Sequence, residues 1–274
     1  MNELSNSSLH VAVIQMDVKI GDPSSNYQHI ERLLDEAVDS SGIASFTKPD
    51  VIVLPEMWNT GYALTELADI ADEQGVRTRG MLSAFAKHHQ VNIVAGSVAV
   101  KQADGTFANR SFVFNRNGEV VHHYDKLHLF RLMDEEQFLQ QGVHSGEFRM
   151  DDISFGIMIC YDIRFPELAR KLALGGAQIL FVPAQWPNPR KNHWRTLLQA
   201  RAIENQMYVV ACNRVGVSGD TSFFGSSMVI DPWGEVLAEG GEQEQILRTT
   251  IDLELVTNVR KRIPIFADRR PELY

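Results

Sequence analysis

The chain carries an internal repeat, and this repeat most limits the folds open to it. The segment Ser111–Val120 (SFVFNRNGEV) matches Ser227–Val236 (SMVIDPWGEV) at an offset of 116 residues. At the same offset VNIVAGS, residues 91–97, aligns with MYVVACN, residues 207–213. Each of these apolar segments follows a pattern typical of a helix. The sequence therefore predicts two similar halves that share one architecture.

Each half alternates strands with helices and ends in a hairpin, turned at Asn117–Gly118 in one copy and Pro232–Gly234 in the other. The early strands are nearly continuous runs of Val, Ile and Leu, which is typical of a sheet covered on both faces. A helical pattern at Tyr27–Val38 would cover one face. The other half supplies an apolar partner for the second face. We predict an α/β fold, a four-layer αββα sandwich built from two similar α/β halves, as a single domain over residues 1–274.

The composition narrows the class of protein. The 26 Lys and Arg residues against 35 Asp and Glu residues give a net charge of -9, which argues against nucleic acid as a partner. No stretch approaches the roughly 18 uninterrupted apolar residues of a membrane helix, and the N-terminus lacks the pattern of a secretion signal. Two cysteines, Cys160 and Cys212, are too few for a disulfide framework. We expect a cytoplasmic protein with no membrane partner.

Three reactive side chains follow predicted strands. Glu56 follows VIVLP, Lys126 follows VVHHYD, and Cys160 ends FGIMIC. In the repeat, Glu56 corresponds to Ala184 and Cys160 corresponds to Gln15 or Met16, so the scaffold needs neither group at the equivalent position. Because ligands in α/β folds bind beyond the carboxyl ends of strands, these side chains are candidates for chemistry.

A thiol with the ordinary pKa of about 8.5 is mostly protonated at neutral pH and gains from a base or a cation. Glu56 could be the base. Lys126 could be the cation that favours the thiolate and later stabilises a tetrahedral oxyanion. These roles predict nucleophilic catalysis by Cys160.

The motifs LPEMWNTGY, YDKLHLF, ICYDIRFPE, VPAQWP and RAIENQMYVVACNRVG together resemble the nitrilase superfamily of carbon-nitrogen hydrolases over nearly the whole chain. The resemblance implies Glu56 as general base, Lys126 as transition-state stabiliser and Cys160 as nucleophile. It also implies an αββα fold that commonly forms dimers and needs no metal and no organic cofactor. A second active-site glutamate is implied seven residues before a glycine; Glu135 fits this spacing to Gly142, and the adjacent Glu136 is the alternative.

The motifs are most similar to the omega-amidase branch, which hydrolyses the terminal amide of 2-oxo-dicarboxylic acid monoamides. This resemblance implies a small-molecule amide substrate, a thioester intermediate and release of ammonia. The substrate carboxylate needs a cationic seat. We expect Arg164 first, and the alternatives are Arg190, Lys191 and Arg214. Other candidate substrate-binding residues are the backbone N–H of Tyr161 at the oxyanion and pocket walls formed by Tyr62, Trp186 and Phe224.

Several alternatives stay open from the sequence. The same triad could serve a carbamoyl-amine hydrolase, a deaminated-glutathione-type amidase or a nitrilase. A papain-like hydrolase would pair Cys160 with His128 or His193. A metal-binding module could use HHYDKLH, residues 122–128, although alternation along a strand would separate its ligands. A non-catalytic binding protein on the same fold would not need all three triad members.

The C-terminal segment Ile263–Tyr274 has no partner in the four-layer plan. Its apolar residues Ile265, Phe266 and Tyr274 look exposed. Together with the outer helices, this segment suits a two-fold interface, so we predict a homodimer.

Overall fold

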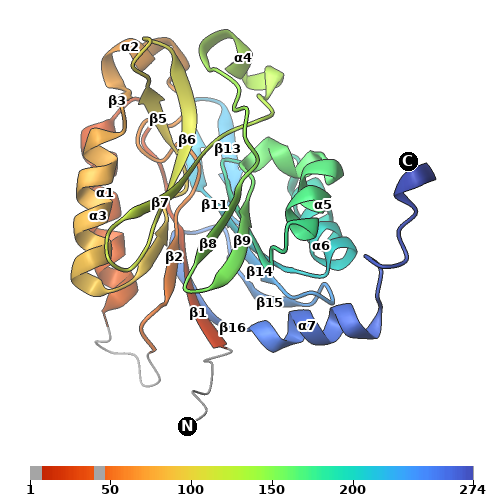
Figure 1. Cartoon of the computed structure of the whole chain (residues 1–274). Helices are drawn as coiled ribbons and strands as arrows, with labels where there is room; N and C mark the ends of the chain where they lie inside the picture. The colour runs from red at the N-terminus through yellow and green to blue at the C-terminus, as the bar shows by residue number, and fades with distance from the viewer. Residues whose placement is uncertain (1–7, 40–46, 274) are drawn as a thin grey trace.

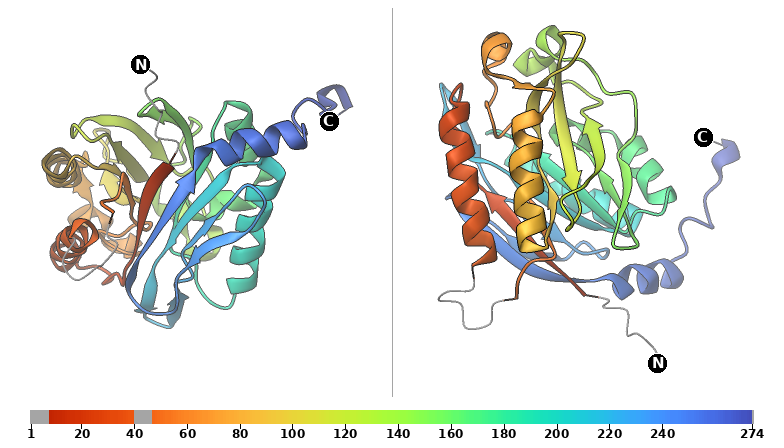
Figure 2. Two further views of the ribbon diagram at one scale, coloured as in Figure 1. Left: turned by 90° about the horizontal axis from the view of Figure 1, so that it is seen from below. Right: turned by 60° about the vertical axis from the view of Figure 1, so that its left-hand side comes forward.

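The computed structural model describes residues 8–39 and 47–273, and these residues form the predicted αββα sandwich. Helices α1 (Pro23–Val38) and α3 (Val76–His89) cover the outer face of the first sheet (Figure 1). Helices α5 (Pro166–Leu174) and α6 (Lys191–Asn205) cover the outer face of the second sheet, and Figure 2 shows the same layers from two further sides. The short helices α2 (Leu67–Ile70) and α4 (Glu135–Phe138) lie together at one end of the sandwich.

Within the described residues, the first sheet has eight strands. In spatial order they are β16 (Gln245–Asp252), β1 (Ser8–Gln15), β2 (Val51–Val53), β4 (Asn92–Val94), β6 (Phe107–Phe114), β5 (Val98–Lys101) and β3 (Asp72–Glu73), with β7 (Val120–Asp125) also paired to β6. Strands β1, β2 and β4 run parallel, and β6 and β7 form the predicted hairpin.

The second sheet repeats this plan, with six strands in the part of the chain that the structure describes. In spatial order they are β15 (Val236–Glu239), β14 (Met228–Ile230), β11 (Tyr208–Asn213), β10 (Ile179–Ala184), β9 (Ile153–Ile157) and β8 (Glu147–Met150). Strands β9, β10 and β11 are parallel like β1, β2 and β4, and β14 pairs with β15 in the second predicted hairpin. The repeat in the sequence therefore corresponds to a repeat in the fold.

The last strand of each half joins the sheet of the other half. After the β6–β7 hairpin the chain crosses to form β8, which pairs antiparallel with β9. After the β14–β15 hairpin it crosses back to form β16, which pairs with β1 along its whole length, from Ser8 opposite Asp252 to Gln15 opposite Gln245. These crossings support the single-domain hypothesis for residues 1–274, which stays a prediction.

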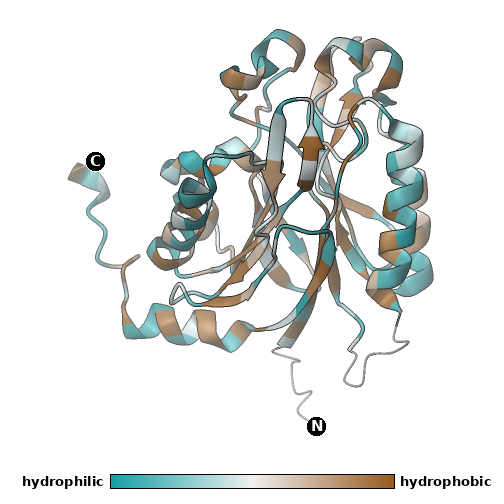
Figure 3. Ribbon diagram, turned by 180° about the vertical axis from the view of Figure 1, so that it is seen from behind, coloured by the Kyte–Doolittle hydropathy of each residue, from teal (hydrophilic) through white to brown (hydrophobic). Residues whose placement is uncertain are grey.

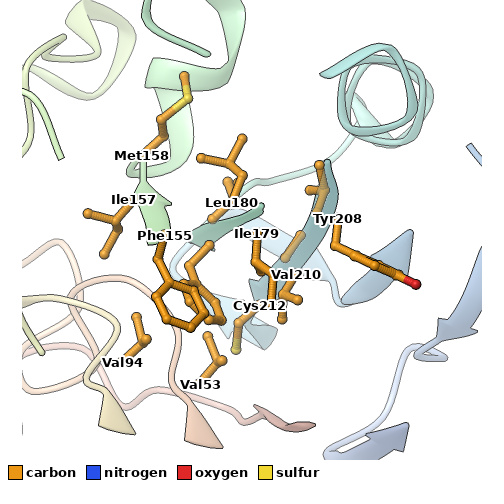
Figure 4. Packing of buried hydrophobic residues seen from close by; sticks show 14 of the residues in the cluster. Val53, Val94, Phe155, Ile157, Met158, Ile179, Leu180, Tyr208, Val210 and Cys212 are labelled. Carbon is orange, nitrogen blue, oxygen red and sulfur yellow. The ribbon is translucent and has the colours of Figure 1, made fainter. Parts of the chain in front are cut away.

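Alternation along the strands explains why both faces of each sheet are buried. On β1, Val11 and Val13 belong to the core between the sheets, whereas Ala12 and Ile14 pack under α1 and α3. Figure 4 shows Val53 and Val94 of the first sheet facing Phe155 and Cys212 of the second. In Figure 3 the central strands are mostly hydrophobic, while the outer helices alternate hydrophobic with hydrophilic residues. Cys212 lies fully buried in this core.

Several elements differ from the sequence prediction. Helix α1 begins at Pro23, four residues earlier than expected, because Asp22 caps it by accepting a hydrogen bond from the Ser25 N–H. The crossing strands β8 and β16 were not predicted, and neither was the hairpin of β12 (Val215–Ser218) and β13 (Thr221–Phe224).

The C-terminal segment follows α7 (Leu253–Arg262), ends in the short turn η4 (Pro271–Leu273) and extends away from the sandwich (Figure 2). The prediction that Ile265 and Phe266 are exposed was wrong, since both are half-buried. The Phe266 ring lies between the guanidinium groups of Arg170 and Arg260, at 5.4 and 5.2 Å. Tyr274 lies outside the described residues.

Arg214, between β11 and β12, is a fully buried cation that ties the two halves together. Its five N–H donors are all used. The acceptors are the carbonyl oxygens of Val215 and Val18, the side-chain oxygens of Gln185 and Ser218, and the Asp17 carboxylate. Arg214 is therefore a structural residue with no donor left for a substrate.

Replacing Arg214 should destabilise the fold. Arg214→Met leaves buried oxygens of Val18, Val215 and Gln185 without their donor, so the free energy of unfolding should fall by about 2–4 kcal/mol in urea titrations. The control is Arg195→Met, which breaks a partly exposed pair with Glu239 and should cost about 0–1 kcal/mol. Equal losses in the two variants would contradict the bridging role of Arg214.

Candidate active site

Glu56 lies in the loop after β2, between the two sheets, with its side chain fully buried. This loop comes within 3.5 Å of the second half, from the Glu56 backbone nitrogen to the carbonyl oxygen of Ala184, its counterpart in the repeat. Gly96 permits the loop's path, since its φ is +59° and a Cβ there would lie 1.9 Å from the Pro55 carbonyl oxygen. The two halves are therefore in contact at Glu56 and Ala184, where one copy of the repeat has a carboxylate and the other has a methyl group.

Lys126 follows β7 and reaches the same point, with no exposed surface. Its Nζ lies 2.9 Å from Glu56 Oε1 and 2.6 Å from Glu135 Oε1. Glu135 begins α4, is fully buried, and also accepts a hydrogen bond at Oε2 from the Phe130 N–H at 3.0 Å. Glu136, the alternative, is exposed on the same short helix. The structure thus brings Glu135, and not Glu136, to Lys126.

Cys160 starts the short 3-10 turn η3 (Cys160–Arg164) that follows β9. Its φ is +47°, a conformation uncommon for a residue with a side chain. Asp162 holds the turn, accepting from the N–H groups of Ile159 and His128 at 2.9 and 3.0 Å. The Tyr124 hydroxyl also donates to Asp162, at 2.7 Å. Asp162 therefore fixes the cysteine turn to the segment that carries Lys126.

Burial and neighbouring charges set the pKa values of Lys126, Glu56 and Glu135. Burial alone would lower the pKa of Lys126, but the carboxylates of Glu135 and Glu56 raise it, so Lys126 is an ammonium. Burial opposes ionisation of Glu56, yet Lys126 and further donors bring its pKa below the ordinary value. The pKa of Glu135 is raised, chiefly by burial.

The pKa of Cys160 is raised well above its ordinary value, first by burial and then by the Glu56 carboxylate. Lys126 lowers this pKa, in the direction expected, but burial and the Glu56 carboxylate outweigh it. At rest Cys160 is a neutral thiol, and Glu56 is the ionised base that can take its proton.

A small pocket opens onto Cys160. Four of the five predicted substrate-binding residues line it: Tyr62, Tyr161, Arg164 and Trp186. The pocket is also lined by residues that the sequence did not single out, namely Phe130, Met133, Gln185 and Pro187.

Two guanidinium groups lie at this pocket, those of Arg164 and Arg190. Both residues are half-buried, whereas Cys160 and Gln185 are buried. Arg164 lies over the Trp186 ring at 4.7 Å, and Arg190 lies over the Phe130 ring at 5.6 Å. Burial, and also the charge of Arg190, lower the pKa of Arg164. Two cations close enough to repel each other form a suitable seat for an anion.

Other predicted residues lie elsewhere. Phe224 is buried in β13 and is not among the described residues that line the pocket. Lys191 lies over the Phe224 ring and is paired with Glu242 at 3.5 Å. Arg214 is fully engaged in the fold, as described above.

Two residues that the sequence did not single out hold the Glu56 carboxylate in place. Asn109, on β6, donates to Glu56 Oε1 at 2.9 Å, and the Gln185 N–H donates to Glu56 Oε2 at 2.8 Å. Gln185 also donates through its side chain to the carbonyl oxygens of Glu56 and Met57. The repeat could have pointed to Gln185, because it follows the counterpart of Glu56.

The residues of the alternative hypotheses contact groups other than those hypotheses require. His128 Nδ1 lies 2.7 Å from Asp162, and His193 Nδ1 lies 3.4 Å from Arg164, so their contacts are with groups other than Cys160. Asp125 of the HHYDKLH motif pairs with Arg110 at 2.6 Å. Within residues 8–39 and 47–273, no three or more His, Cys, Asp or Glu side chains are grouped to hold a metal ion. No helix in this part of the chain is long and apolar enough to span a membrane.

Comparison with known proteins agrees with this geometry. The carbon-nitrogen hydrolase family matches residues 10–261. The chain is 45% identical to the 2-oxoglutaramate amidase of Bacillus subtilis, over 96% of this chain and 98% of that protein. It is 35% identical to omega-amidase YafV of Escherichia coli K12, over 95% of this chain and 96% of that protein.

Among solved structures, the carbon-nitrogen hydrolase of Helicobacter pylori G27 superposes with a TM-score of 0.88 at 29% identity, covering 98% of this chain and 97% of that one. XC1258 of Xanthomonas campestris, described as a CN-hydrolase superfamily protein, superposes with a TM-score of 0.87 at 29% identity, covering 96% of this chain and 97% of that one. The chain therefore belongs to the carbon-nitrogen hydrolase family of the nitrilase superfamily, and it is an enzyme that hydrolyses carbon–nitrogen bonds.

Proposed function

We propose that the enzyme is a cytoplasmic omega-amidase that hydrolyses the terminal amide of small carboxylate-bearing substrates such as 2-oxo acid omega-amides. One observation carries this proposal: the pocket that opens onto Cys160 also presents the guanidinium groups of Arg164 and Arg190. A substrate with an amide at one end and a carboxylate at the other matches both features. The similarity to 2-oxoglutaramate amidase supports the same substrate class. The two free cysteines suit a reducing compartment.

The proposed reaction begins when Glu56 takes the thiol proton as Cys160 attacks the amide carbon. The new oxyanion is stabilised by the Lys126 ammonium and by the backbone N–H of Tyr161. Glu56 returns the proton to the leaving nitrogen, and ammonia departs to leave a thioester on Cys160. Glu56 then deprotonates a water molecule that attacks the thioester; the acid leaves, and Glu56 returns the proton to the Cys160 thiolate. Glu135 anchors Lys126 throughout, and the proposed reaction uses no metal or organic cofactor.

The roles of the two cysteines should separate cleanly. Cys160→Ala should abolish ammonia release, because no other group can form the thioester. Cys212→Ala should keep kcat within about twofold and mainly lower stability, since Cys212 lies in the core and its Sγ donates to the Ile14 carbonyl oxygen. A coupled ammonia assay and mass spectrometry of the acyl-enzyme check both variants. Turnover by Cys160→Ala would contradict the mechanism.

The arginine pair should set substrate preference. Removing one charge-assisted hydrogen bond costs about 1.5–3 kcal/mol, so Arg164→Ala or Arg190→Ala should raise KM for a 2-oxo acid omega-amide by roughly 10- to 150-fold. An uncharged amide of equal length should be nearly unaffected. Lys191→Ala is the matched control, since its ammonium pairs with Glu242. Equal losses on both substrates would mean that the arginines hold the pocket walls instead.

A substrate panel tests the proposed function against its alternatives on the same residues. These alternatives are a carbamoyl-amine hydrolase, a deaminated-glutathione-type amidase and a nitrilase. The wild-type enzyme should release ammonia fastest from the carboxylate-bearing omega-amide. A clear preference for an uncharged amide, a carbamoyl amine or a nitrile would reject the omega-amidase assignment.

The enzyme should also form a homodimer. The C-terminal segment after α7 extends away from the sandwich, and Ile263 and Leu273 on it are 46% and 67% exposed. A second copy would bury these side chains. Light scattering at micromolar concentration should give twice the chain mass, and deleting residues 264–274 should shift the distribution toward monomer. A wild-type monomer under these conditions would contradict the proposal.

A further inference from the structure

The Tyr62 hydroxyl lies between the two active-site carboxylates. Its oxygen is 2.7 Å from Glu56 Oε1 and 2.6 Å from Glu135 Oε1. A phenol carries one proton, so it can donate to only one of these oxygens. The other contact is also at hydrogen-bond distance, and two oxygens this close need a proton between them. The geometry therefore requires one proton more than Tyr62 and Lys126 supply.

The hydrogen-bond partners show which carboxyl group holds the extra proton. Glu56 accepts from the Lys126 ammonium, the Asn109 amide and the Gln185 N–H, in addition to Tyr62. Such a set of donors stabilises a carboxylate. Glu135 has fewer donors, those of Lys126 and Phe130 besides the shared hydroxyl.

Charge balance leads to the same assignment. Glu56, Glu135 and Lys126 have no exposed side-chain surface, so two carboxylates and one ammonium would leave a net buried charge. One protonated carboxyl group makes the cluster neutral. The titratable groups that face Glu56 are Lys126, Tyr62, Glu135 and Cys160.

We propose that Tyr62 is a positioning residue that holds Glu135 protonated and Glu56 ionised. In this arrangement the Glu135 carboxyl donates to the Tyr62 oxygen, and the Tyr62 hydroxyl donates to Glu56. Tyr62 thereby keeps the general base ready at the start of each half-reaction. This inference rests on the general-base role proposed for Glu56. It reassigns Tyr62, which the sequence suggested only as a pocket wall.

The directions of the two carboxyl pKa values agree with this arrangement. The pKa of Glu135 is raised, chiefly by burial, while that of Glu56 is lowered because Lys126, Tyr62 and Gln185 outweigh its burial. Environments that separate the pKa values of two carboxyl groups commonly assign them different roles.

Infrared difference spectroscopy tests the proton directly and needs no turnover. At neutral pH, the wild-type spectrum minus that of Glu135→Gln should contain the carbonyl band of a protonated carboxyl group. The matched difference for Glu136→Gln should lack it, because Glu136 is exposed beside Glu135. Absence of the band from the Glu135→Gln difference overturns the inference. That outcome would leave the proposed function standing, and a different preferred substrate would leave the band in place.

Kinetics test the role of Tyr62. In Tyr62→Phe, Glu56 loses a donor, its pKa rises, and the acidic limb of the kcat/KM profile should move up by about one pH unit. Activity should recover toward the wild-type value at high pH. The control is Tyr161→Phe, another pocket tyrosine, whose acidic limb should stay in place even if KM changes. An unchanged limb in Tyr62→Phe, or equal shifts in both variants, overturns the positioning role.

Discussion

The paired contact of Lys126 with Glu56 and Glu135 is the interaction on which the active site depends. All three side chains are fully buried, so the Lys126 ammonium and the Glu56 carboxylate each need the other's charge nearby. The ammonium keeps Glu56 ionised in a place where burial favours the acid. At Cys160, burial and the Glu56 carboxylate outweigh the effect of Lys126, so the pKa of the thiol is raised and no resting thiolate forms. In the proposed reaction, Cys160 is therefore activated by proton transfer to Glu56 during the attack.

The architecture makes this cluster possible. Glu56 belongs to the first half and Cys160 to the second, and they meet between the two sheets. The last strand of each half pairs in the sheet of the other half, β8 with β9 and β16 with β1. Asp162 then fixes the cysteine turn to the segment of Lys126 through His128 and Tyr124. The repeated strands position the side chains. Glu56 and Cys160, whose counterparts in the repeat are different residues, supply the reactive groups.

The sequence predicted the layers, the two hairpins and the meeting of Glu56 with Lys126, because a repeated apolar pattern and strand ends are local features. It did not predict β8, β16 or Asn109, since these depend on pairing between distant segments. Phe224 was predicted at the pocket from its aromatic character. Residue type alone does not show which way a side chain on a hairpin faces. Arg214 could not be distinguished from Arg190 by residue type, because only the fold shows that its donors are already used.

The protonation state of Cys160 in the resting enzyme tests the central claim most directly. Thiolate absorbance can be titrated in the wild type and in Cys160→Ala, whose difference isolates this thiol from Cys212. A buried thiol beside an ionised Glu56 should give no thiolate signal at neutral pH, and the signal should emerge only above the ordinary thiol range. A thiolate already present at neutral pH would contradict general-base activation by Glu56.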